Sequence, residues 1–160
     1  MKHRKYTVNY ILYALVQFTW GIVQNVAGAL MVALIKLRDP KRKVFYYHGA
    51  VVCHWKMTGS MGLGMFIFYG HYDEEKSYAD AVLVHEYGHT IQSCILGPLY
   101  MFVIGIPSMV WNATPVFQRW RKEGRYTYYD FYPEGWANYE GERVLKMPAP
   151  RHRLADDPDA

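Results

Sequence analysis

The residues best suited to chemistry lie within five positions of one another, in the stretch His85-Glu86-Tyr87-Gly88-His89. On a helix, His85 and His89 project from the same face, so both imidazoles can bind one metal ion while Glu86 faces the open coordination position. Zinc held by nitrogen and carboxylate ligands lowers the pKa of a bound water to about 7, and a neighbouring glutamate can accept the proton. The stretch therefore predicts a catalytic zinc site, with Glu86 as general base and then general acid. Gly88 is expected to leave space beside the metal.

A third protein ligand has to come from elsewhere in the chain, because a catalytic zinc site has three. Glu134 and Asn138 lie four residues apart at the start of a predicted helix. We expect Glu134 to complete a His, His, Glu set, and Asn138 to accept a hydrogen bond from the non-metal nitrogen of a ligand histidine. A glutamate also favours a helix N-terminus without any metal. The competing ligands are Glu140 and Glu142 on the same helix, and His54, His71 and Asp130 outside it.

A hydrolytic site also uses a hydrogen-bond donor for the oxygen that becomes negative in the transition state. The sequence offers His71 and several tyrosines of a basic connector, and it does not choose among them. Most of these tyrosines are expected to be packing residues. The tyrosine candidates are Tyr126, Tyr128, Tyr129 and Tyr132.

The segment before the HExxH stretch has the pattern of a small sheet. Short runs rich in Val, Tyr and Phe are separated by turns that contain glycine, and such runs predict strands. The order of runs and turns predicts an antiparallel β-meander. Its strands are expected at 44–47, 50–55 and 61–69.

Two helices are predicted to hold the metal ligands. Together with the predicted sheet they make the fold class α+β. The first begins at Ser77 or Asp80 and ends near Gly97, so the HExxH stretch lies in its middle. The second begins at Pro133, a favourable first helical residue, and ends near Lys146. Between them, residues 91–118 have no charge but are interrupted by glycine and proline. That pattern predicts an apolar hairpin or loop packed on the active-site helix, not a spanning helix.

An uncharged apolar run covers residues 11–35 and has basic residues on both sides. A helix of this length can span a bilayer, which favours membrane association. Gln24 and Asn25 are costly in lipid, so a second interpretation stays open. In that interpretation the helix is buried or interfacial, and the two amides find partners inside the fold. The localisation is predicted as membrane-associated, and otherwise cytoplasmic.

The length of 160 residues is enough for one ordinary core. We therefore predict an apolar N-terminal helix over 1–43, a catalytic domain over 44–147 and a flexible tail over 148–160. The net charge of +4 is modest, and basic residues cluster beside apolar stretches. This suits a membrane surface, and nucleic acid is not expected as a partner. Cys53 and Cys94 are expected to be free thiols.

The HExxH stretch, followed by Glu134-x-x-Ala137-Asn138, resembles the gluzincin metallopeptidases. In that clan a helix with HExxH supplies two zinc ligands, and a glutamate on a later helix supplies the third. The clan usually has Asp four residues after that glutamate; Asn138 keeps a hydrogen-bond acceptor there but removes a charge. The resemblance implies a zincin-like fold in which strand 61–69 is the sheet edge along which an extended peptide lies.

A longer resemblance covers residues 59–138. The stretches HEYGHTIQS at 85–93, LGPLY at 96–100 and GIPS at 105–108 are similar to a group of poorly characterised bacterial proteins. They are also similar to the C-terminal regions of some Rhs-type toxins. This resemblance says little about the substrate.

The function predicted from the sequence is zinc-dependent hydrolysis of peptide bonds by a metalloendopeptidase that acts on a peptide or protein. One alternative is a non-enzymatic membrane or interaction protein in which zinc is structural or absent. Another is a membrane-embedded zinc protease of the site-2 type. That class requires several spanning helices and an Asp as third ligand, whereas this chain offers at most one good span.

Overall fold

The computed structural model of the chain describes residues 9–71 and 75–150. Within these residues the fold is α+β, as predicted, with six α-helices and a four-stranded mixed sheet. The helices are α1 (Tyr10–Thr19), α2 (Ile22–Arg38), α3 (Lys76–Leu96), α4 (Ile106–Ala113), α5 (Pro115–Lys122) and α6 (Tyr132–Leu145). Shorter helical segments are η1 (Gly97–Leu99), η2 (Met101–Gly105) and η3 (Tyr128–Asp130), and the strands are β1 (Val44–Tyr47), β2 (Ala50–His54), β3 (Met61–Leu63) and β4 (Phe66–Tyr69).

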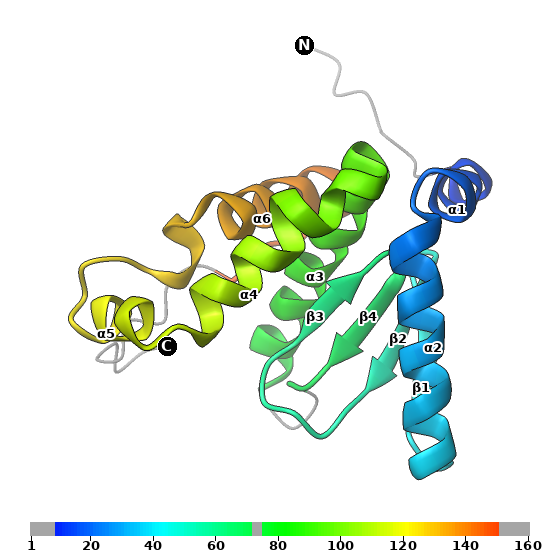
Figure 1. Cartoon of the computed structure of the whole chain (residues 1–160), viewed down its shortest axis with the longest axis horizontal. Helices are drawn as coiled ribbons and strands as arrows, with labels where there is room; N and C mark the ends of the chain where they lie inside the picture. Colours follow the sequence, from blue (N-terminus) through cyan, green and yellow to red (C-terminus); the bar gives the residue numbers. More distant parts are fainter. Residues whose placement is uncertain (1–8, 72–74, 151–160) are drawn as a thin grey trace.

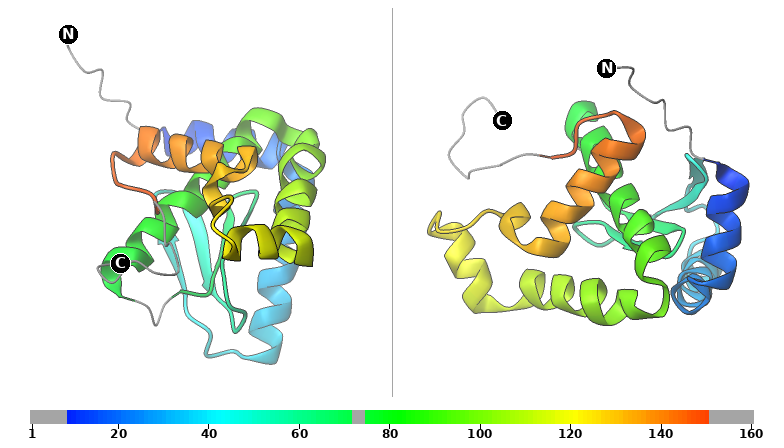
Figure 2. Two further views of the ribbon diagram at one scale, coloured as in Figure 1. Left: turned by 90° about the vertical axis from the view of Figure 1, so that its left-hand side faces the viewer. Right: turned by 90° about the horizontal axis from the view of Figure 1, so that it is seen from above.

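The sheet lies between two helical layers, with α2 on one face and α3 on the other (Figures 1 and 2). Successive side chains of a strand point to opposite faces, so each strand contributes to both layers. Val52 and Ile67 pack on the side of α3, with Leu83 and Tyr87 of that helix. Cys53 and Phe68 pack on the side of α2, together with Met31 and its neighbours. Helix α6 covers the outer side of α3.

The predicted antiparallel meander was wrong in its pairing. The strand order is β1-β2-β4-β3, and β2 pairs with β4 in parallel. The predicted strand 61–69 is a tight hairpin of β3 and β4, because Gly64 adopts a left-handed conformation with φ of +63° at its turn. The connection 55–60 lets this hairpin place β4 beside β2 and leaves β3 at the edge. An alternating apolar pattern does not reveal such a turn.

The predicted single helix over 11–35 was also wrong, because α1 and α2 meet at an angle of 95°. Polar side chains near the bend are buried and have partners. Gln17 donates to the Thr90 carbonyl at 2.9 Å, and Gln24 donates to Ser93 Oγ at 2.9 Å, so both helices are tied to α3. Asn25 donates to Gln17 Oε1 at 3.0 Å and accepts from the Met65 N–H at 2.8 Å. Gln24 and Asn25 thus find partners inside the fold, as the interpretation of this segment as a buried or interfacial helix requires.

No described helix is by itself long and apolar enough to cross a bilayer. Two pairs of helices are long and apolar enough only when the members of each pair are taken together, and both pairs are sharply bent: α1 with α2, and the segment Lys76–Leu99 with Met101–Ala113. Membrane association therefore stays a prediction.

The two cysteines and the chain end complete the fold. Cys53 is buried and Cys94 is partly buried, and both are free thiols, as predicted. Of the predicted flexible tail, residues 148–150 lie against α6, where the Ala149 N–H donates to Glu142 at 3.1 Å and the Pro150 carbonyl accepts from Asn138 at 2.9 Å. Residues 151–160 lie outside the described residues.

Asn25 is expected to be a strong determinant of stability. Asn25→Ala leaves the Met65 N–H and Gln17 Oε1 without this buried partner, and such losses cost about 2–3 kcal/mol in the free energy of unfolding. The measurement is denaturant unfolding followed by circular dichroism. Asn112→Ala, at an exposed position of α4, is the matched control and should change the free energy of unfolding by less than about 0.5 kcal/mol. Equal stability of the two variants would contradict the role of the amide.

Candidate metal site

Helices α3 and α6 approach so closely that backbone touches backbone. A Cβ at Gly88 of α3 would lie 1.9 Å from the Ala137 carbonyl oxygen, and one at Gly141 of α6 would lie 2.1 Å from the Val84 carbonyl oxygen. No side chain larger than hydrogen fits at either position. The expectation that Gly88 leaves space beside the metal was therefore wrong, because the space is occupied by α6. This contact is what brings the third candidate ligand to the two histidines.

The structure brings His85, His89 and Glu134 together as a group that could bind a metal ion. Glu134 Oε2 lies 3.1 Å from His85 Nε2 and 3.4 Å from His89 Nε2. Ligand atoms about 2.0–2.1 Å from a tetrahedral zinc lie roughly 3.3 Å apart, which agrees with these separations. All three residues are buried, with exposed fractions of 4%, 6% and 0%.

Glu86 Oε2 is buried and has no hydrogen-bond partner among the described residues. Glu134 Oε2 is also buried, and its neighbours are the two imidazole nitrogens, which can donate to it only when they are protonated. Buried polar atoms are almost always satisfied, so oxygens in such surroundings indicate a place for an ion or a water. Carboxylate oxygen and imidazole nitrogen are also the ligands that zinc takes in hydrolytic sites. The donor set therefore fits a metal ion.

The metal-facing nitrogen of each histidine is fixed by an amide on its other side. Asn138 Oδ1 lies 2.7 Å from His85 Nδ1, and Gln92 Oε1 lies 2.8 Å from His89 Nδ1. Each amide NH₂ group donates to a backbone carbonyl, at 2.9 Å for Asn138 and 2.8 Å for Gln92, so each amide oxygen must face the imidazole. Each Nδ1 then carries a proton and each Nε2 faces Glu134, with a lone pair available whenever the imidazole is neutral.

Glu86 is positioned by the edge of the sheet. The Gly62 backbone N–H of β3 bonds to its carboxylate. A Cβ at Gly62 would lie 2.7 Å from His89 Cβ, so only glycine allows the strand to pass this close to α3. Burial raises the pKa of Glu86, while the adjacent histidines lower it and Glu134 raises it further. A base of raised pKa is closer to the pH at which it must take and return a proton.

Without a metal ion, the positive charge of the site is a proton on His89. Burial disfavours protonation of His89, but Glu134 and Glu86 outweigh burial and raise the pKa of His89 to about 9. Burial alone would raise the pKa of Glu134, but the two facing imidazoles lower it well below its ordinary value. Glu134 is therefore an anion throughout the neutral range, as a metal ligand must be.

The other predicted ligands lie elsewhere, each with partners of its own. Glu140 accepts from Trp136 Nε1 at 3.1 Å and pairs with Arg143, and Glu142 accepts from the Ala149 N–H. Asp130 accepts from the Thr127 N–H at 2.6 Å in a capping box. The rings of His54 and His71 both pack against Tyr69, which lies in β4.

The structure also separates the tyrosine candidates. The Tyr128 and Tyr129 rings lie 6.5 and 5.3 Å from the His85 ring, whereas Tyr126 packs on Trp111 and the Tyr132 hydroxyl donates to the Val103 carbonyl. Tyr128 hydrogen-bonds to the Ser108 side chain, which in turn hydrogen-bonds to Glu134 Oε1.

Three residues of the site were missed from the sequence: Gln92, Ser108 and Tyr100. Gln92 could have been found, because it lies three residues after His89 on the same helix face. Ser108, on α4, and Tyr100, whose hydroxyl donates to the Gly62 carbonyl at 2.9 Å, come from the apolar segment and belong to no motif that indicates a site.

Comparison of the chain with protein-family models, with curated proteins and with solved structures gave no significant match in any of the three.

The identity of the third ligand can be tested by zinc stoichiometry after dialysis. Glu134→Ala should abolish zinc retention, because it removes one of three ligand atoms. Asn138→Ala should weaken zinc binding by about 10- to 100-fold, the usual effect of removing an outer partner of a ligand histidine. Glu140→Ala and Glu142→Ala are matched controls on the same helix and should retain the metal. Loss of zinc only in a control variant would place the third ligand at that position instead.

Zinc affinity should fall as the pH falls. The ion binds neutral imidazole, so below pH 9 or so it must displace the proton of His89, and the dissociation constant should rise about tenfold per pH unit between about 8 and 6. Competition with a chelating indicator calibrated at each pH measures the slope. Calorimetry in buffers of different ionisation enthalpy should show release of about one proton at neutral pH. A flat profile without proton release would contradict the raised pKa.

Proposed function

We propose that this chain is a zinc-dependent hydrolase of peptide bonds, a metalloendopeptidase of the gluzincin type. One observation carries the proposal: His85 Nε2, His89 Nε2 and Glu134 Oε2 converge in a buried site where Glu86 Oε2 has no partner among the described residues. The three candidate ligands and the base come from two helices in the order that the HExxH motif and a later glutamate require.

The alternative of a structural zinc site has less support. A structural site is closed by four protein ligands, whereas a catalytic site has three and keeps one position for water. The candidate group contains three side chains among residues 9–71 and 75–150. An adjacent carboxylate of raised pKa has no purpose in a structural site, but hydrolysis needs one.

In the proposed reaction, His85, His89 and Glu134 would hold a zinc ion, which would act as a Lewis acid toward the substrate carbonyl and would lower the pKa of a water. Glu86 accepts a proton from the water that attacks the carbonyl carbon. The C–O bond forms and the C–N bond breaks, and Glu86 returns the proton to the leaving amine. The Gly62 N–H holds one oxygen of Glu86 during both transfers, so the other oxygen is left to exchange the proton.

Tyr128 is the proposed donor to the oxygen that becomes negative. Burial, with the charges of Glu134 and Glu86, raises the pKa of Tyr128 well above its ordinary value, so the hydroxyl keeps its proton. Its hydrogen bond to Ser108 holds the hydroxyl beside Glu134. A fixed donor at such a place stabilises a developing charge without reorganisation.

A peptide would bind along β3, the edge strand beside the site. Gly62 is already engaged there: its N–H bonds to Glu86 and its carbonyl accepts from the buried Tyr100 hydroxyl at 2.9 Å. Pairing of a substrate with this carbonyl requires the Tyr100 hydroxyl to withdraw. Since Glu86 is only 4% exposed, substrate entry also requires the segment η1–α4 or η3 to move aside.

The test is hydrolysis of casein and of a mixed peptide library by the zinc-loaded full chain. Glu86→Gln should lower the rate by at least about 10²-fold, because it removes the proton acceptor, and should leave zinc stoichiometry unchanged. Glu123→Gln, at an exposed glutamate outside the site, is the matched control and should keep full activity. Zinc binding without any hydrolysis, or full activity of Glu86→Gln, would refute the proposed function.

A further inference from the structure

Helices α1 and α2 bury amide side chains and expose many apolar ones. Gln17 and Gln24 are fully buried and Asn25 is 2% exposed. Apart from Tyr13 and the residues of α2 that pack on the sheet, the large apolar side chains point out, with Ile11 75% and Leu30 61% exposed. A helix on the surface of a water-soluble protein shows the opposite arrangement. Other exposed apolar residues of the two helices include Leu12, Leu15, Phe18, Ile22, Val23, Val26, Leu34 and Leu37.

The same apolar surface continues onto the segment η1–α4. Helix α2 contacts η1, and both α2 and α4 lie on the near side of the molecule in Figure 1, an arrangement that the two views of Figure 2 also show. Leu99, Phe102, Ile106, Met109 and Val110 of this segment are exposed, Phe102 to 70%. Within the described residues, neither 9–35 nor 91–118 contains a charged side chain. We call this surface of α1, α2 and η1–α4 the apolar face.

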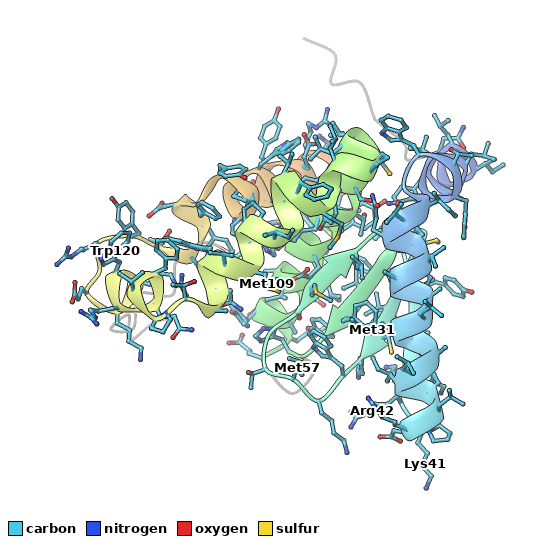
Figure 3. The ribbon with its side chains drawn as sticks, viewed as in Figure 1. Met31, Lys41, Arg42, Met57, Met109 and Trp120 are labelled. Carbon is cyan, nitrogen blue, oxygen red and sulfur yellow. The ribbon has the colours of Figure 1, made fainter. Side chains whose placement is uncertain are left out.

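Cations border the apolar face where α2 ends. Arg38, Lys41 and Lys43 are exposed there, and Figure 3 labels Lys41 beside Arg42 at the end of α2. Basic residues next to an apolar helical surface are attracted to the anionic headgroups of a bilayer. The order of apolar face and cationic border matches the order of hydrocarbon and headgroup in a membrane.

We propose that the apolar face is immersed in one leaflet of an anionic lipid bilayer, with Arg38, Lys41 and Lys43 at the headgroups. Hydrocarbon is the partner that suits this face best, because a protein partner would be expected to meet polar and hydrogen-bonding groups across an interface of such extent. Burial of helix faces in the membrane surface is also the known behaviour of amphipathic helices that do not span. This inference is independent of hydrolytic activity.

The sheet argues against a spanning arrangement. Helix α2 is about 25 Å long at 1.5 Å per residue, and it packs along β3 and β4. A spanning α2 would place the same sheet at the depth of the hydrocarbon, together with the outer edge of β1, which pairs with no further strand among the described residues. Free backbone groups are not tolerated in lipid. Immersion of the outer side of α2 alone avoids this cost.

Vesicle flotation of the detergent-purified full chain tests the proposal. After detergent removal, the protein should float with phosphatidylcholine vesicles, and more strongly when phosphatidylglycerol is included. The double variant Leu30→Glu, Leu34→Glu should reduce partitioning at least about tenfold, because charges are costly in hydrocarbon. The control variant is Tyr139→Glu, at an exposed aromatic residue of α6, the helix that covers the outer side of α3, and it should float like the parent chain.

Three outcomes would overturn the proposal: no flotation of the parent chain, equal loss in the control variant, or a dimer in detergent-free solution that Leu30→Glu, Leu34→Glu dissociates. The last would make the face an interface between two copies.

Circular dichroism checks that each variant folds. If the variant Leu30→Glu, Leu34→Glu does not fold, quenching of tryptophan fluorescence in the parent chain by lipids with brominated acyl chains tests immersion instead. The half-exposed Trp20 at the α1–α2 bend should be quenched, and Trp20→Phe should remove most of that signal; absence of quenching refutes immersion.

Discussion

The candidate metal site depends on how closely α3 and α6 approach each other. At Gly88 and Gly141 the two helices meet backbone to backbone, with 1.9 and 2.1 Å between the position of a Cβ and the facing carbonyl oxygen. A larger residue at either position would push the helices apart, and Glu134 extends from α6 on a side chain of fixed length. The two glycines therefore decide whether its carboxylate reaches the HExxH histidines. Asn138, one turn further along α6, reaches His85 through the same contact.

Charge is the second constraint on the site. Two carboxylates and two imidazoles are buried together, where an uncompensated charge is expensive. Without a metal, the raised pKa of His89 supplies a positive charge beside Glu134 and Glu86. A divalent cation could replace that proton and would also give Glu86 Oε2 a partner. Either cation compensates the two acidic side chains at a place with so little exposure.

The site was more predictable from the sequence than the sheet, because helical spacing is local and strand pairing is not. The HExxH histidines lie with Glu134 as the spacing on two helices indicates. In the sequence, Gly64 looks like any glycine in an apolar run. In the structure, a Cβ at Gly64 would lie 2.5 Å from Asn25 Oδ1 of α2. This contact, together with the hydrogen bond from Met65, shows why the turn forms at that point. Ser108 lies in the stretch GIPS, which carries a resemblance but indicates no ligand, so only the folded chain shows its contact with Glu134.

The buried amides connect the apolar face to the metal site. Asn25 holds the turn of the β3–β4 hairpin through the Met65 N–H. The strand that leads into this turn, β3, contains Gly62, whose N–H bonds to Glu86. Gln17 holds the Thr90 carbonyl, one residue after His89. The buried amides of α1 and α2 therefore support both β3, which contacts Glu86, and α3, which carries Glu86 and His89. If the apolar sides of these helices lie in lipid, the membrane and the candidate metal site share one support, and a change in how α1 and α2 are seated is transmitted to Gly62 of β3 and to α3.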